Sequence, residues 1–230
     1  MSRKVLIVIP AFDEDSTIEK VVKNCKKFGN VLVVNDGSKD KTGLLAKKTG
    51  AIVISNEKNM GYEYSLNIGY KFALKHKYKI MLTLDGDGQL PHSSIPSFIN
   101  FIEQGFAIVI GKRFKVFRKT EKLLAKISFL ISGIADPYCG MKAYDLNLNK
   151  QDNFSRYNSV GTSLAFDYFS LNLPIKNIDI AILARNGKSK FGGRIISELR
   201  LIPSFFIGSA RLIFFWLSRK YIKKLNKKTS

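Results

Sequence analysis

The chain has 230 residues, of which 45% are hydrophobic, which allows one α/β domain with a filled core and excludes a disordered chain. Its formal net charge is +20, so we expect an anionic partner such as nucleic acid, an acidic membrane or a phosphorylated substrate, unless the lysines only form a solvated surface. The two cysteines, Cys25 and Cys139, lie far apart in the sequence, which argues against a zinc site or a disulfide framework. No run of about 18 uncharged apolar residues is present, which argues against a plain membrane span.

Short apolar runs alternate with helical patterns along the first half of the chain. The runs predict buried parallel strands at Val5–Ile9, Val31–Val34, Ala51–Ile54, Ile80–Leu84 and Ala107–Ile110. The helical patterns between them span Ser16–Phe28, Lys41–Thr49, Tyr62–Lys75 and Pro91–Glu103. Ser16 is expected to cap the first helix, with Glu19 completing a capping box. This rhythm predicts an open, mostly parallel, Rossmann-like sheet, whose ligands bind at the carboxyl ends of the strands.

The alternation becomes irregular beyond residue 111. A basic and then helical stretch covers Lys112–Ile134, and a helix is expected at Thr162–Leu171. Two further strands are expected at Met141–Leu146 and Ile175–Leu183. The first apolar run, Val5–Ile9, is too short for the core of a signal peptide, so we interpret it as a strand.

Carboxylates follow three of the predicted strands. Asp and Asn in turns often bond their own backbone, but three acidic clusters at one edge of a sheet favour a binding site. The clearest cluster is Asp85-Gly86-Asp87-Gly88-Gln89, because two carboxylates one residue apart can converge on Mg²⁺ or Mn²⁺. Such a metal would neutralise a diphosphate leaving group, the difficult part of moving a sugar from a nucleotide.

Four segments in this order resemble the GT-A fold of family 2 glycosyltransferases. They are Ile9-Pro10-Ala11-Phe12-Asp13-Glu14, Asn35-Asp36-Gly37-Ser38, Asn59-Met60-Gly61 and Asp85-Gly86-Asp87-Gly88-Gln89. Within this family the chain is most similar to polyprenyl-phosphate glycosyltransferases of the dolichyl-phosphate mannose and bactoprenol glucose types. The resemblance covers about residues 4 to 190. It implies an inverting enzyme with a GT-A domain, which we expect over residues 1–193, and the apolar and basic residues 194–230 that follow are expected to associate with a membrane.

The resemblance also implies a role for each matching residue of the first half. The nucleotide base and ribose would be lined by Pro10, Ala11, Asp13 and Glu14, with Asn59 and Gly61 also binding substrate. Asp36 would hydrogen-bond the base. The metal would be held by Asp85, which also faces the ribose, by Asp87, and by Gln89 at its edge.

The second half carries weaker matches to the same family. Gly111-Lys112-Arg113 resembles a Gly-Ser-Arg segment whose arginine meets phosphate, and Lys112 departs from it. The segment Asp136 to Lys142 resembles Asp-x-x-Ser-Gly-Phe-Arg, with Cys139 and Lys142 as replacements, and the match predicts that Lys142 binds substrate. The closing Arg-x-x-Gly-x-Ser-Lys loop matches at Arg185, Ser189 and Lys190, which the resemblance makes substrate-binding.

Two acceptor classes fit these residues. Asp167 falls where the family usually has Glu, and a carboxylate in this region serves as general base in relatives that glycosylate a hydroxyl. A phosphate acceptor is already ionised at pH 7, so it needs only cations to hold it. Candidate cations are Arg113, Lys115, Arg118, Lys122, Lys126, Arg185 and Lys190, unless they form a solvated basic face. We therefore expect transfer from a UDP- or GDP-sugar to a polyprenyl phosphate, with a hydroxyl of a lipid-linked or surface glycan as the alternative acceptor.

The segment from Ile195 to Tyr221 has apolar residues at helical spacing, interrupted by Arg211 and followed by several lysines. This pattern is typical of helices that lie on an anionic membrane surface, although packing against the sheet as ordinary core is the alternative. A full span would bury arginine at high cost. We expect peripheral or re-entrant association with the cytoplasmic face of the cell membrane.

Other classes of protein fit less well. A nucleic-acid-binding module would explain the charge, but the acidic clusters would repel phosphates unless they held metal. No G-x-G-x-x-G follows the first strand and no Walker A loop is present, which disfavours a dinucleotide-dependent dehydrogenase and a P-loop enzyme. We therefore expect no nucleic-acid partner.

Overall fold

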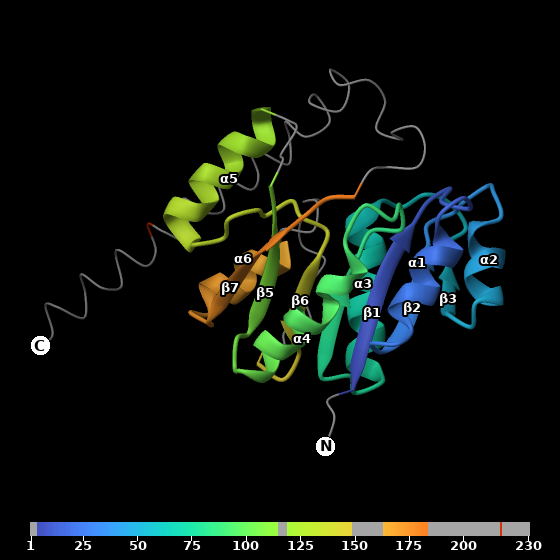
Figure 1. Ribbon diagram of the computed structural model, residues 1–230, viewed down its shortest axis with the longest axis horizontal. Helices are drawn as coiled ribbons and strands as arrows, with labels where there is room; N and C mark the ends of the chain where they lie inside the picture. The colour runs from blue at the N-terminus through green and yellow to red at the C-terminus, as the bar shows by residue number, and fades with distance from the viewer. Residues whose placement is uncertain (1–3, 115–118, 149–162, 184–216, 218–230) are drawn as a thin grey trace, which may run out of the picture.

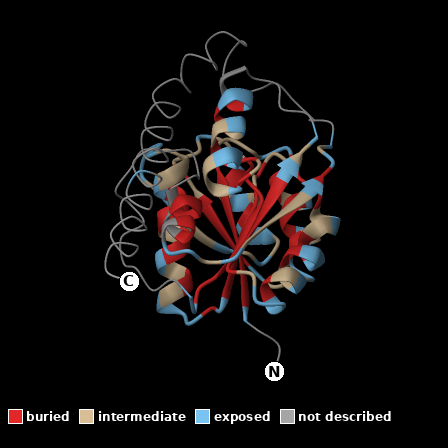
Figure 2. Ribbon diagram, turned by 90° about the vertical axis from the view of Figure 1, so that its left-hand side faces the viewer, coloured by how far each residue is buried: buried red, intermediate tan, exposed pale blue. Residues whose placement is uncertain are grey.

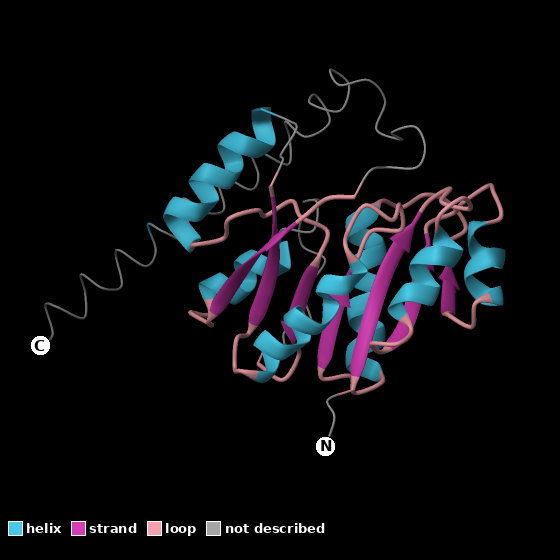
Figure 3. Ribbon diagram, in the orientation of Figure 1, coloured by secondary structure: helices cyan, strands magenta, loops and turns pink. Residues whose placement is uncertain are grey.

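The computed structural model describes residues 4–114, 119–148, 163–183 and Leu217. These residues build one seven-stranded sheet with helices on both faces (Figures 1 and 3). The strands are β1 (Val5–Ala11), β2 (Asn30–Asn35), β3 (Ile52–Ser55), β4 (Ile80–Thr83), β5 (Ile108–Arg113), β6 (Lys142–Asp145) and β7 (Ile175–Ile180). The helices are α1 (Ile18–Cys25), α2 (Thr42–Lys48), α3 (Tyr62–Lys75), the 3₁₀ turn η1 (His92–Ser94), α4 (Ile95–Glu103), α5 (Lys119–Ser132) and α6 (Ser163–Ser170).

The strand order is β3-β2-β1-β4-β6-β5-β7, and every pairing is parallel except the two made by β6. The chain runs from β1 outward to β3 and then returns to place β4 on the other side of β1. The carboxyl ends of β1 and β4 are therefore a topological switch point, where open α/β sheets bind ligands. The predicted mostly parallel sheet is confirmed, and the antiparallel insertion of β6 is an addition to it.

Side chains of β1 alternate between two hydrophobic cores, one on each face of the sheet. Ile7 and Ile9 belong to the core formed with α1, α2 and α4, whereas Leu6 and Val8 belong to the core formed with α3 and α6. Figure 2 shows the buried residues gathered along the central strands and the inner sides of the helices. Since all of β1 is buried, its apolar run is continuous rather than alternating.

All seven strands expected from the sequence are present, with ends that shift by at most three residues. The α3 helix has the predicted bounds, Tyr62–Lys75. The helix expected over Pro91–Glu103 is divided into η1 and α4, and the stretch expected from Lys112 contains the end of strand β5 and the helix α5, Lys119–Ser132.

The predicted cap of the first helix is wrong. The α1 helix begins at Ile18, its N-cap position is Thr17, no side chain caps it, and Ser16 is exposed. The Thr17 hydroxyl instead donates to the carbonyl oxygen of Gly86 at 2.8 Å and to that of Glu14 at 3.2 Å. Both bonds are donated by the hydroxyl, whereas a cap must accept a backbone N–H of the helix, so Thr17 ties the start of α1 to the loop after β4 without capping it.

No helix within the described ranges is long and apolar enough to cross a membrane. The segment expected to associate with a membrane, residues 194–230, lies outside the described residues apart from Leu217. The predicted boundary at residue 193 lies there too.

Candidate active site

The loops that follow β1 and β2 are joined by hydrogen bonds at the carboxyl edge of the sheet. The backbone N–H of Asp13 donates to the Ser38 hydroxyl at 2.9 Å, and an Asp13 carboxylate oxygen accepts the backbone N–H of Lys39 at 2.8 Å. The backbone N–H of Glu14 donates to the Thr42 hydroxyl at 2.7 Å. Asp13 and Glu14 are both half-buried, so their acidic groups lie at the rim of the edge. Pro10 and Ala11 end β1 just below them, and both are buried.

Asp36 is a buried carboxylate that holds the loop between β3 and α3. One of its oxygens accepts the Asn56 side-chain amide at 2.7 Å and the Met60 backbone N–H at 2.9 Å. The other accepts the Gly61 backbone N–H at 2.8 Å. Both oxygens therefore have partners within the protein, and any contact between Asp36 and a base would be made alongside these bonds.

Gly37 permits the close approach of this loop. Its φ is +72°, and a Cβ at this position would lie 2.4 Å from the carbonyl carbon of Lys58. Only glycine fits both conditions. Asn59 follows in the loop and is exposed, so its side chain is accessible to a ligand at this edge.

Asp85 lies in the loop after β4 and is confined on two sides. The Tyr62 hydroxyl donates to its Oδ1 at 3.0 Å. A Cβ on Gly140 would lie 2.2 and 2.3 Å from the two carboxylate oxygens, so the backbone of Gly140 packs directly against the carboxylate. Burial and then the charge of Asp87 raise the pKa of Asp85 to about 6, although the Tyr62 hydrogen bond and the charge of Lys142 lower it.

The hydroxyl of Tyr62 acts as a neutral donor in this contact. Burial, followed by the charge of Asp85, raises the pKa of Tyr62 well above its usual value, so the proton stays on the phenol.

Asp85 and Asp87 fit a divalent cation that takes its other ligands from a substrate. Within the described ranges, no group of three or more His, Cys, Asp or Glu side chains forms a closed metal cage. The negative charges of these two neighbouring carboxylates repel each other, and a cation between them would relieve that repulsion. Such a pair matches a Mg²⁺-type site, which uses few protein oxygens together with substrate phosphates. An Asp87 oxygen accepts the backbone N–H of Gln89 at 3.0 Å, and the Gln89 carbonyl accepts the backbone N–H of Leu183 at 2.8 Å. These two bonds hold the backbone of Gln89 close to the carboxylates, and its side chain is half-buried there.

Arg113 ends β5 within a network of buried acids. Its Nε donates to Asp136 at 2.6 Å and a terminal nitrogen donates to the other Asp136 oxygen at 2.9 Å. The same terminal nitrogen donates to Glu121 of α5 at 3.0 Å. Burial lowers the pKa of Arg113, but the hydrogen bonds and charge of Asp136 and the charge of Glu121 outweigh it, and the net shift is upward. The guanidinium predicted to meet phosphate is thus already paired with two carboxylates.

Lys142 is buried in β6 rather than open to the edge. Its side chain is 2% exposed, and its ammonium donates to the Cys139 carbonyl. Burial lowers the pKa of Lys142, and the charges of Cys139, Asp136 and Asp85 among others oppose that shift. The residue predicted to touch substrate therefore lies behind Asp85, where it supports the carboxylate through its charge.

Several predicted site residues are not described by the structure. Asp167 belongs to α6, but its side chain lies outside the described part of the chain. Arg185, Ser189 and Lys190 of the closing loop also lie outside it, so their roles stay predictions.

Sequence reasoning missed several residues that hold this edge together, and three of them meet at the acidic loop after β4. They are Tyr62 and Gly140, which contact Asp85, and Thr17, which joins the loops after β1 and β4. The one signal for Tyr62 was its place directly after the Asn-Met-Gly segment, and Gly140 stood within a matched segment without a role.

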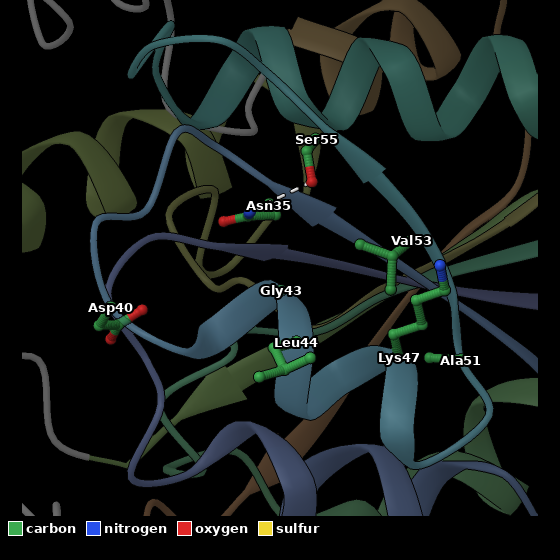
Figure 4. Close-up of a pocket in the computed structure, with 8 residues that line it drawn as sticks. All are labelled: Asn35, Asp40, Gly43, Leu44, Lys47, Ala51, Val53 and Ser55. Atoms are coloured by element: carbon green, nitrogen blue, oxygen red, sulfur yellow. Dashed lines mark hydrogen bonds between the residues drawn. The ribbon is translucent and has the colours of Figure 1, made fainter.

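A cavity of about 380 Å³ lies between α2 and β3, beside this edge (Figure 4). It is lined by Asn35, Asp40, Gly43, Leu44, Lys47, Ala51, Val53 and Ser55. The Asn35 side-chain amide donates to the Ser55 hydroxyl across its floor at 3.2 Å. Neither Asp85 nor Asp87 lines this cavity, so it does not coincide with the acidic cluster.

Sequence comparisons relate the chain to proteins named as transferases. The chain is 28% identical over 239 aligned positions to the UDP-N-acetylglucosamine–dolichyl-phosphate N-acetylglucosaminyltransferase of Methanococcus voltae, covering 86% of this chain and 95% of that one. It is 25% identical to an undecaprenyl-phosphate 4-deoxy-4-formamido-L-arabinose transferase of Pectobacterium atrosepticum, covering 87% of this chain and 64% of that one.

A solved structure shares the fold. It is glucosyl-3-phosphoglycerate synthase of Mycobacterium tuberculosis in complex with Mn²⁺, uridine diphosphate and phosphoglyceric acid. The TM-score is 0.69 at 19% identity, and the match covers 92% of this chain and 79% of that one. The family model described as glycosyl transferase family 2 matches residues 6–172, which include every described acidic loop at the carboxyl edge. The chain belongs to glycosyl transferase family 2 and is a glycosyltransferase.

Proposed function

We propose that the protein transfers a sugar, with inversion, from a UDP- or GDP-sugar to a polyprenyl phosphate at the cytoplasmic face of the membrane, with Mg²⁺ or Mn²⁺ bound. A single observation carries the proposal. The loop that Asp36 holds leads into Tyr62, and the Tyr62 hydroxyl contacts Asp85 at the switch point of the sheet. Two relatives named for transfer to dolichyl or undecaprenyl phosphate, each aligned over more than four-fifths of this chain, support the acceptor class.

The donor side of the proposal uses the loops after β1, β2 and β3. The base and ribose would lie against Pro10, Ala11, Asp13, Glu14, Asp36, Asn59 and Gly61. Asp85, Asp87 and Gln89 would hold the divalent cation, which when bound neutralises the diphosphate as it leaves. The Mycobacterium tuberculosis synthase, solved in complex with Mn²⁺ and uridine diphosphate, supports this pairing of metal and nucleotide.

The acceptor side would lie toward α5. A phosphate acceptor needs cations rather than a general base, and the exposed face of α5 carries Lys122 and Lys126. Three large apolar side chains share that helix surface: Leu123 is 52% exposed, Phe129 57% and Leu130 84%. Figure 1 shows α5 at one corner of the molecule, beyond the end of β5. Lysines beside exposed apolar side chains are typical of a surface that rests on anionic lipid, which supports the membrane partner.

The experiment is transfer from a panel of UDP- and GDP-sugars with Mn²⁺ or Mg²⁺, using undecaprenyl phosphate as acceptor and neutral undecaprenol as control. Glycolipid that forms only from the phosphate and is cleaved by mild acid supports the proposal and names the donor. Nucleotide-sugar binding without such a product would move the proposal to a glycan hydroxyl acceptor with Asp167 as base. A protein that binds none of the nucleotide-sugars would contradict it.

A further inference from the structure

Tyr62 stands where two acid-bearing loops meet, and we propose that it is a positioning residue for Asp85. It is the first residue of α3, and its hydroxyl donates to the Asp85 Oδ1 at 3.0 Å. What Asp85 binds rests on the proposed function, whereas the contact between the two side chains does not.

The backbone that leads into Tyr62 is fixed by another carboxylate. Asp36 is 4% exposed and accepts the backbone N–H groups of Met60 and Gly61 at 2.9 and 2.8 Å. These are the two residues directly before Tyr62, so the start of α3 is tied to the end of β2. A hydrogen bond to a buried charged group is among the stronger ones in a protein, which makes this a firm anchor.

The Asp85 carboxylate also packs against backbone. The Gly140 position has no room for a Cβ, which would lie 2.2 Å from Oδ1 and 2.3 Å from Oδ2. The Thr83 hydroxyl donates to the Gly140 carbonyl at 2.7 Å and keeps that backbone in place. The Asp85 carboxylate is therefore in contact with both the Tyr62 hydroxyl and the Gly140 backbone.

The contacts form a continuous path from the base side of the site to its metal side. It runs from Asp36 through the amides of Met60 and Gly61 to Tyr62, and from the Tyr62 hydroxyl to Asp85. A carboxylate held in one orientation before its ligand arrives loses less conformational freedom on binding. Tyr62 thus prepares Asp85 for the metal and diphosphate.

The test compares Tyr62→Phe with Tyr64→Phe, which removes an exposed hydroxyl from the same helix. Calorimetric titration with UDP and with GDP would be run in Mn²⁺ and again in EDTA. We expect Tyr62→Phe to weaken Mn²⁺-dependent binding about 5- to 10-fold and to leave metal-free binding unchanged, because an Asp85 side chain that is no longer oriented beforehand must be ordered on binding. Equal affinities of the two variants for the Mn²⁺-nucleotide would overturn the proposal.

A second measurement needs no ligand. Urea unfolding midpoints are compared for Tyr62→Phe, Asp85→Ala and the double variant. If Tyr62 acts through Asp85, the shift caused by Tyr62→Phe disappears once Asp85 is alanine, whereas shifts that simply add would contradict the coupling. A wild-type protein that binds neither nucleotide would argue against the proposed function, and the unfolding cycle would then decide the role of Tyr62 by itself.

Discussion

The two sides of the sheet are held together by different interactions. At the β1–β3 side, backbone N–H groups of the loops donate hydrogen bonds to side-chain oxygens. Beyond β4, buried ion pairs hold the chain. On the first side, Ser38 and Thr42 accept backbone N–H groups of the loop after β1, and Asp36 accepts those of the loop after β3. On the other side, Arg113 is paired with Asp136 and Glu121, which are 1% and 3% exposed.

This difference sets how each region tolerates change. The bonds that Ser38 and Thr42 accept join neutral groups and contribute about 1 kcal/mol each, part of which water can replace at a half-exposed loop, whereas the bonds to the buried Asp36 carboxylate are stronger. A buried ion pair adds little net stability when intact, but removing one partner leaves an uncompensated buried charge. Apart from Asp36, the β1–β3 side is therefore expected to lose little stability on substitution, whereas removing one partner of an ion pair on the β5–α5 side is expected to cost several kcal/mol.

The largest effect expected is on stability, from Arg113→Met. Leaving Asp136 and Glu121 without their cation should lower the free energy of unfolding by about 3–5 kcal/mol, measured from urea denaturation. Lys112→Met is the matched control, because the neighbouring Lys112 pairs with Asp179 at 3.1 Å with both side chains more than half exposed. That control should change the free energy of unfolding by less than about 1 kcal/mol. Similar losses in both variants would remove the contrast between the two regions.

The next effect concerns catalysis. Asp87→Ala should lower the rate of sugar transfer by about 100- to 1000-fold, because several kcal/mol of charge stabilisation by the metal are lost. Asp15→Ala is the control, since Asp15 is an exposed carboxylate in the first loop of the same edge. Near wild-type turnover in Asp87→Ala would refute the metal assignment.

A single added methyl group should distinguish the two glycines beside Asp85. Gly140→Ala would force a Cβ against both Asp85 oxygens and should cost about 1–3 kcal/mol of stability. In Gly86→Ala the new Cβ would meet its nearest neighbours at 3.4 Å, which is ordinary contact, so we expect a smaller loss. Thermal unfolding of the two variants gives the comparison, and an equal loss would show that Asp85 moves aside at little cost.

The smallest effect tests the hydroxyl between the loops after β1 and β4. Thr17→Val keeps the shape and removes the bond to the Gly86 carbonyl, so we expect a loss of about 1 kcal/mol and a melting temperature lower by about 2–4 °C. Ser16→Ala should have almost no effect, because Ser16 is exposed and caps nothing. The reverse ranking would restore Ser16 as the cap of α1.

The order of strands along the chain and the three acidic loops could be predicted because they depend on neighbouring residues. Apolar runs such as Val5–Ile9 and Ile80–Leu84 show their burial in the sequence itself, and parallel strands bring their carboxyl ends to one edge. Residues that contact Asp85 could not be found in this way. Tyr62 and Gly140 meet it from elements far away along the chain, and no local pattern encodes that contact.

By itself, the sequence determined the α/β class, the places of the strands and the segments by which the family is identified. Tertiary structure alone decided that β6 runs antiparallel between β4 and β5, that Arg113 is paired with Asp136 and Glu121, and that Lys142 is buried behind Asp85. The physical reason is range: periodicity and turn chemistry act over a few residues, whereas ion pairs and close packing depend on which distant segments the folded sheet brings together.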